Sequence, residues 1–184
     1  MSKLKVGLLG KGGLVGQTYE KLLKDHPYFE LGFAPARGEL DQIEKGRDCP
    51  LIFSALPSKA AKMYDPLYAK QGNVVVSAAS FHRLQKTVPL IIPEINGGKL
   101  KNWAGSIIAK PNCSLQSILL PLYPLHQKFC LKKVAVTTLQ SISGAGSKFT
   151  LRDNVIPFIE GEEEKIQCTK TGKTVRDQKV VLYS

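Results

Sequence analysis

Apolar residues in this chain fall into short runs separated by amphipathic stretches. The apolar runs have the length and β-branched content of buried strands, and they predict five strands at residues 5–9, 29–34, 50–55, 73–78 and 106–109. Helical spacing of apolar positions predicts one helix over residues 59–70 and another after the first strand, with Val15, Tyr19, Leu22 and Leu23 on its apolar face. Strands that alternate with helices predict an α/β fold, a Rossmann-like doubly wound parallel sheet.

Fewer elements are predicted in the second half of the chain. A helix is expected to start near Cys113 and to end at Pro121 or Pro124, and residues 133–140 predict a further strand. Residues 34–50 are short for a crossover, so we expect a trimmed helix there. The expected domains are an NAD(P)-binding domain that ends in the cysteine helix and an incomplete α+β substrate and dimerisation domain, at residues 1–130 and 131–184.

Composition narrows the class of protein and its partners. The chain is 43% hydrophobic and 22% charged, which predicts a soluble globular protein with a sizeable core. Apolar stretches stay well short of the roughly 20 residues that span a bilayer, so we expect a cytoplasmic protein without a membrane partner. The formal charge of +11 is spread along the chain without a nucleic-acid-binding motif. It therefore favours anionic small molecules over nucleic acid.

A glycine-rich turn follows the first predicted strand. A tight turn at a helix start lets a pyrophosphate approach backbone N–H groups, and the order of strand, turn and helix favours this reading over a purely structural turn. The expected cofactor residues are Gly10, Lys11, Gly12, Gly13, Leu14, Val15 and Gly16. Arg37 follows the second strand, where an arginine can accept a ribose 2′-phosphate, so it favours NADP over NAD unless it is simply a solvated loop residue.

Cys113 lies between a predicted strand and a predicted helix. A thiol at a helix start meets the positive end of the macrodipole and free N–H groups, which favour the nucleophilic thiolate. Cys113 is therefore the candidate nucleophile, although a cysteine taken alone is more often an inert buried residue. The remaining cysteines form no CxxC pair and no cluster with histidine, so neither a metal site nor a disulfide is expected at Cys49, Cys130 or Cys168.

His126 is not expected to act as a base for this thiol. His126 lies thirteen residues further on, which is about 20 Å of helical rise, and the two prolines interrupt the path. His26 and His82 lie in loop-like surroundings and are expected at the surface. Near the C-terminal end, Glu162 and Lys165 have the spacing of one helix face and can hold an amine and an anionic group of one ligand, unless the run is a solvated face.

Seven segments together resemble a known family. In chain order they are GKGGLVG at 10–16, FSALPS at 53–58, SAASFHR at 77–83, VPLIIPEIN at 88–96, PNCS at 111–114, TLQSISGAG at 138–146 and NVIPFI at 154–159. They resemble aspartate-semialdehyde dehydrogenase, and within it the branch found in archaea and fungi. The resemblance covers residues 5 to about 166.

The resemblance implies an activity and a role for each matching residue. Cys113 attacks the acyl phosphate of aspartate, phosphate leaves, and NADPH reduces the thioester to the semialdehyde, a step in lysine, threonine and methionine biosynthesis. Gln140 would hold the acyl intermediate, and Asn112 would bind substrate. Phosphate would be bound by Arg83 and Lys165, and the substrate amine by Glu162. A homodimer or homotetramer is implied as well.

The chain also departs from the family. Gly12 replaces a common threonine, which removes a hydroxyl donor from the turn, and residues 147–149 replace a Gly- and Pro-containing turn. The family's later substrate arginine and acid–base histidine have no match before Ser184, so we expect impaired turnover.

Other functions stay open beside this one. Malonyl-CoA reductase shares the cysteine chemistry, and a non-catalytic nucleotide-binding remnant is the alternative from another class. N-acetyl-glutamyl-phosphate reductase fits less well, because it typically has Gly where Asn112 stands.

Overall fold

The computed structural model describes residues 2–141, and the chain divides into two units between Pro111 and Asn112. Residues 1–111 form the first unit and residues 112–184 belong to the second. Each unit is described by itself.

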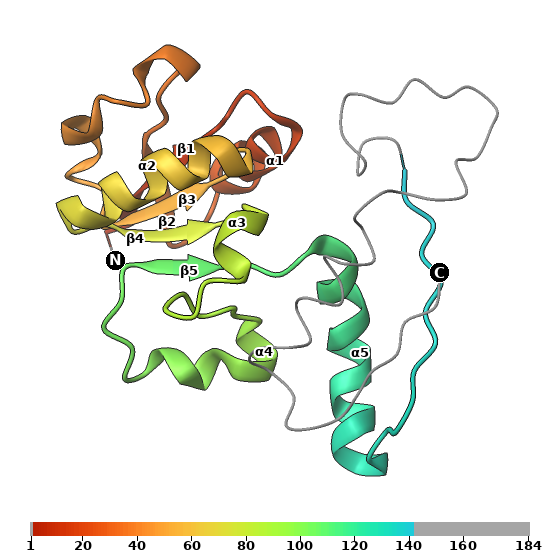
Figure 1. Ribbon diagram of the computed structural model, residues 1–184. Coiled ribbons are helices and arrows are strands. Elements are labelled where there is room, and N and C mark those ends of the chain that lie inside the picture. The colour runs from red at the N-terminus through yellow and green to blue at the C-terminus, as the bar shows by residue number, and fades with distance from the viewer. Residues whose placement is uncertain (1, 142–184) are drawn as a thin grey trace. The chain divides into compact units, whose positions relative to one another are not determined.

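A five-stranded parallel sheet forms the centre of the first unit, in the order β2-β1-β3-β4-β5 (Figure 1). Its strands are β1 (Leu4–Leu9), β2 (Phe29–Phe33), β3 (Leu51–Ser54), β4 (Val74–Ser77) and β5 (Ile107–Ala109). The connections contain α1 (Leu14–Leu23), α2 (Ser58–Gln71), α3 (Ser80–Arg83) and α4 (Pro93–Asn96), with short 3-10 helices η1 (Arg37–Glu39), η2 (Ile43–Gly46) and η3 (Gly97–Leu100). The Rossmann-like doubly wound sheet predicted from the sequence is confirmed, and η1 and η2 stand where a trimmed helix was expected.

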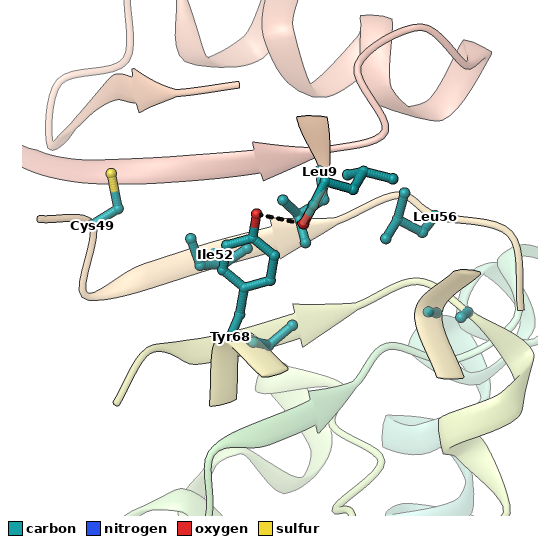
Figure 2. Packing of buried hydrophobic residues seen from close by; sticks show 9 residues of the cluster. Leu9, Cys49, Ile52, Leu56 and Tyr68 are labelled. Carbon is teal, nitrogen blue, oxygen red and sulfur yellow. Dashed lines mark hydrogen bonds between the residues drawn. The ribbon is translucent and has the colours of Figure 1, made fainter. Parts of the chain in front are cut away.

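Helices cover both faces of the sheet, because the chain runs from β1 toward one edge and from β3 toward the other. Right-handed crossovers in opposite directions place α1 and α2 on opposite faces. Two neighbours in β3 show this alternation. The Phe53 ring stacks on Tyr19 of α1 with centroids 5.2 Å apart, while Ile52 packs in the core cluster with Tyr68 of α2 (Figure 2).

The apolar face predicted for the first helix is partly wrong. Gly16 and Leu23 are buried and Tyr19 is half-buried, so the buried stripe follows an i, i+3, i+7 spacing. Val15 and Leu22 lie outside this stripe and are 51% and 66% exposed. The side of α1 that is removed from solvent is therefore a single row of residues, narrower than the predicted face.

The described part of the second unit contains one long helix, α5 (Cys113–Phe129). It does not end at Pro121 or Pro124 as predicted but continues through both. A proline inside a helix removes one N–H and leaves the carbonyl four residues earlier without its helical donor. Both prolines are exposed, as are Ser117 and Leu120 whose carbonyls lose that donor, so water can replace the missing bonds.

Residues 133–140 were predicted to form a strand, and this is wrong in the described structure, where they form no regular element. A strand requires a neighbour to take its N–H and C=O groups. No strand pairs with this segment within residues 2–141.

The buried hydroxyl of Tyr68 allows the packing of the core to be tested. Its ring has no exposed surface, and its hydroxyl donates to the Leu40 carbonyl at 3.2 Å, the dashed bond in Figure 2. Burial, followed by Asp41 and Tyr64, raises the pKa of Tyr68 to about 12, whereas an unfolded tyrosine has a pKa of about 10. The folded state therefore holds this proton more tightly.

We expect the stability due to the neutral hydroxyl to be complete below pH about 10 and lost as the pH rises to about 12. The Tyr68→Phe variant should be about 1 kcal/mol less stable at neutral pH, and its deficit should shrink across that window. Urea unfolding of both proteins at pH 8, 10 and 11.5 measures this; a deficit that stays constant with pH contradicts the buried hydroxyl.

Candidate functional site

The glycine turn lies where the connections of the sheet reverse direction, between β1 and β3. Ligands of doubly wound sheets bind at the carboxyl ends of the strands at this switch point. Gly10 has a φ of +81°, and a Cβ there would lie 2.9 Å from the Ala55 carbonyl oxygen that follows β3. At Gly16 a Cβ would overlap the Gly10 carbonyl oxygen. Glycine at both positions lets three backbone segments pack closely.

Because of this packing, the N-terminal end of α1 faces outward from the turn. Gly13 is the N-cap, and the first helical bond runs from Gln17 N–H to the Gly13 carbonyl at 2.9 Å. The N–H groups of Leu14, Val15 and Gly16 precede that bond and so have no acceptor within the helix. The first turn of α1 contains no acidic side chain to compete for them. These donors and the half-buried Lys11 suit an anionic group such as a pyrophosphate.

Gly12 differs from its neighbours because it has free space around it. A Cβ there would meet nothing within 4 Å of the described atoms. Gly12 and Gly13 are both exposed, so the turn is open to solvent. The space that a threonine side chain would take at position 12 is therefore open, and no neighbouring side chain fills it.

Arg37 is exposed at the start of η1, shortly after β2. Since β2 lies beside β1, its carboxyl end is at the same edge as the glycine turn. The position where an acid would bind a ribose 2′-hydroxyl is occupied by apolar residues, Ala34 and Pro35. Glu39, two residues after Arg37, accepts the Ala36 N–H at 3.1 Å through its carboxylate.

Arg83, the expected phosphate ligand, ends the short helix α3. Its Nε donates to the Lys110 carbonyl at 3.1 Å and its Nη2 donates to the Ala78 carbonyl at 2.8 Å. The half-buried guanidinium is thereby bonded to the backbone after β4 and after β5. Its plane is fixed at the carboxyl edge of the sheet.

His82 corrects a prediction, since it was expected at the surface and is only 1% exposed. Its Nε2 lies 3.0 Å from Oδ2 of Asp65, which has no exposed surface. A carboxylate on the buried face of a neighbouring helix makes burial of this ring possible. His26, which was also expected at the surface, is half-buried, because its ring stacks on Phe29 with centroids 4.7 Å apart.

Asp65 itself was missed by sequence reasoning. The available signal was its place in α2, four residues after Ala61 and three before Tyr68, both of which are buried. An acid on the apolar face of an amphipathic helix needs donors from neighbouring elements.

Within the second unit, the start of α5 carries the candidate nucleophile. Cys113 is exposed at the first helical position. Asn112 is the N-cap, and its Oδ1 accepts N–H groups of Ser114 at 2.8 Å and Leu115 at 3.4 Å. These N–H groups were predicted to be free, and they are instead capped by Asn112. Asn112 therefore has a structural role in addition to any contact with substrate. The thiol keeps its place at the positive end of the helix.

Gln140 comes close to this helix start, as its Nε2 donates to Ser114 Oγ at 3.3 Å. The structure thus brings an amide beside the residue next to Cys113. Glu162, Lys165 and Cys168 lie outside the described residues.

The other described cysteines differ from Cys113 in position. Cys49 is buried in the first unit, where burial and Asp48 raise the pKa of its thiol. Cys130 is exposed but caps the opposite, negative end of α5. In residues 2–141, side chains of His, Cys, Asp and Glu form no group that could hold a metal ion, and no helix is both long and apolar enough to cross a bilayer.

Comparison with known proteins agrees with this geometry. A profile described as "Semialdehyde dehydrogenase, NAD binding domain" matches residues 35–103. Aspartate-semialdehyde dehydrogenases of Archaeoglobus fulgidus and Schizosaccharomyces pombe are 35% and 32% identical over 90% and 91% of the chain. Malonyl CoA reductase (NADP) of Metallosphaera sedula is 32% identical over 88% of the chain and 57% of its own length.

A solved structure extends the likeness to three dimensions. Aspartate-semialdehyde dehydrogenase with NADP from Candida albicans has a TM-score of 0.76 at 30% identity, over 90% of this chain and 58% of that one. The chain spans about 60% of the length of the curated dehydrogenases from Archaeoglobus fulgidus and Schizosaccharomyces pombe. Sequence and structure together show that the chain is similar to the archaeal and fungal aspartate-semialdehyde dehydrogenases, and that its residues 35–103 match the semialdehyde dehydrogenase NAD-binding domain.

Proposed function

We propose that this chain serves the NADPH-dependent reduction of aspartyl phosphate to aspartate semialdehyde through a thioester on Cys113. The observation that carries the proposal is an exposed thiol at a helix start in a chain that also presents a helix start for a pyrophosphate. The first supplies a nucleophile and the second a cofactor site. Homologous dehydrogenases support this pairing. Lysine, threonine and methionine biosynthesis would be the pathway context.

The covalent step uses the chain's own thiolate. The Cys113 Sγ forms a bond to the acyl carbon of the substrate, and the bond between that carbon and the phosphate oxygen breaks, so inorganic phosphate leaves. Charge develops on the carbonyl oxygen during this attack, and amide donors near it lower the barrier. Gln140 is the side chain that we assign to this task, because its amide bonds to Ser114 beside the nucleophile.

Binding of the leaving phosphate is assigned to Arg83. The guanidinium is held by two backbone carbonyls, and a planar fork of fixed orientation suits bidentate phosphate binding. Asn112 is assigned to substrate as well. Lys165 and Glu162, which we assign to phosphate and to the substrate amine, lie outside the described residues.

The glycine turn fits NADP, which when bound supplies the hydride that reduces the thioester. Backbone N–H groups at the start of α1 and Lys11 would hold the pyrophosphate, and Arg37 the 2′-phosphate. Support comes from the apolar residues at the end of β2, because they offer no carboxylate to a ribose 2′-hydroxyl and none to repel a phosphate there.

Malonyl-CoA reductase activity is a second candidate, favoured by the 32% identical relative from Metallosphaera sedula. The same thiolate would then displace coenzyme A instead of phosphate. Offering aspartyl phosphate and malonyl-CoA to one preparation with NADPH separates the two candidates by substrate.

The first test replaces the nucleophile. We expect the Cys113→Ser variant to lose NADPH oxidation with aspartyl phosphate by about a thousandfold or more, because a serine hydroxyl lacks the thiolate's nucleophilicity. Cys130→Ser is the matched control, since it removes an exposed thiol from the other end of the same helix. A measurable activity of the parent that Cys113→Ser retains in full would overturn the thioester mechanism.

Alkylation reports on the same thiol without requiring turnover. Iodoacetamide should modify Cys113 before Cys130, since both are exposed but lie at opposite ends of the α5 dipole, and Cys49 last because it is buried. Peptide mass spectrometry over a time course gives the order.

Cofactor preference tests the assignment of Arg37. The Arg37→Ala variant should bind NADPH about tenfold more weakly and NADH with unchanged affinity, because only NADPH has the 2′-phosphate. Arg47→Ala is a suitable control, since Arg47 is exposed in the same connection but close to the amino end of β3. Calorimetric titration with both nucleotides measures the preference, and a parallel loss for NADH would argue against a 2′-phosphate contact.

Two glycines of the turn should respond in opposite ways. Gly16→Ala should weaken NADPH binding by about tenfold or more and lower the Tm, although alanine favours helix formation, because its Cβ overlaps the Gly10 carbonyl. Gly12→Thr should bind NADPH at least as tightly as the parent, since the space around Gly12 is open and a hydroxyl donor is added. Fluorescence titration and thermal unfolding provide the comparison. A tolerated alanine at position 16 would contradict the close packing of the turn.

A further inference from the structure

A buried carboxylate joins three elements at the carboxyl edge of the sheet. Asp65 of α2 accepts from Ser54 Oγ and Ser77 Oγ at 2.7 Å each, and its Oδ2 lies 3.0 Å from His82 Nε2. A carboxylate oxygen only accepts, so the Nε2 atom carries the hydrogen. All four side chains are at most 1% exposed.

The network fixes the turn between β4 and α3. The Ser77 hydroxyl donates to Asp65 and also accepts the Ala79 N–H at 3.3 Å. His82 anchors the other end of α3 to the same carboxylate. Both ends of this four-residue helix are therefore held by one buried group. Such tertiary contacts are needed because a helix of this length is not stable by itself.

The next residue along α3 is Arg83, which also bonds to this turn. Its Nη2 donates to the Ala78 carbonyl, one residue after Ser77. A shift of the turn would move both this carbonyl and the helix that carries the guanidinium. His82 Nδ1 is buried and has no partner among the described residues, so the ring is held from Nε2 alone.

We propose that Asp65 and His82 are positioning residues that set the Arg83 guanidinium for binding a phosphate group. This inference rests on the phosphate role of Arg83 in the proposed function. The network acts through the β4–α3 turn and makes no contact with the ligand itself. A guanidinium displaced by a fraction of an ångström loses bidentate geometry, and with it phosphate affinity.

Inorganic phosphate is the probe, titrated into the full chain and followed by ³¹P NMR, with NADPH affinity measured on the same preparations. We expect Asp65→Asn and His82→Leu to weaken phosphate binding about tenfold, while NADPH binds within about twofold of the parent. His82→Gln should restore most of the phosphate affinity, because its amide can still donate to Asp65. Tyr68→Phe is the control, since it removes a buried hydrogen bond from the same helix without touching the network.

The outcomes separate the two layers of inference. If the parent does not bind phosphate, or if Arg83→Ala binds it as the parent does, the phosphate role of Arg83 fails and the positioning role fails with it. If Arg83→Ala weakens binding but Asp65→Asn and His82→Leu behave like Tyr68→Phe, only the positioning role is overturned. Should the Asp65 and His82 variants not fold, Ser77→Ala tests the same turn with the loss of one oxygen, and unchanged phosphate affinity there overturns the proposal.

Discussion

Burial of the Asp65 carboxylate is the constraint to which the other parts of the first unit conform. A carboxylate removed from water is costly unless donors surround it, and the donors here come from the ends of β3 and β4 and from α3. Ser54 and Ser77 are paired residues in the sheet register, so a slip of either strand would remove a donor. The carboxylate is fully hydrogen-bonded only when the strand register, the position of α2 and the path into α3 are all correct.

The carboxyl edge of the sheet has a second requirement, which concerns backbone instead of charge. Gly10 lies against the Ala55 carbonyl, and Gly16 lies against Gly10, so side chains are excluded from the place where β1 passes into α1. Where side chains are excluded, backbone N–H groups become the surface offered to a ligand. The two requirements occupy neighbouring strands of one edge. Together they explain why small residues gather after β1, β3 and β4.

Local patterns in the sequence predicted the elements, and partners distant in the sequence decided where the predictions went wrong. The strands and the glycine turn were predicted because their periodicity and spacing are local properties. Burial of His82 was not, because it depends on a carboxylate in another helix. The end of α5 was predicted too early, because the rule that proline ends a helix ignores solvent exposure. At exposed prolines, water can bond to the carbonyls that lose their helical N–H donor. At the site, the thiol and the turn were predicted from context, whereas the capping of α5 by Asn112 was missed, although an asparagine directly before a helix is a common N-cap.

The all-parallel topology also affects how the chain acquires its structure. Neighbouring strands are never joined by a tight turn, since each pairing waits for an intervening crossover. β1 is made first but cannot complete its pairing until β3 has left the ribosome, and β5 must follow before β4 is covered. Contacts of this kind slow folding, and they leave apolar strands unpaired during synthesis. The sheet therefore lacks its last strand, and its strand edges stay unpaired, until residue 109 has emerged.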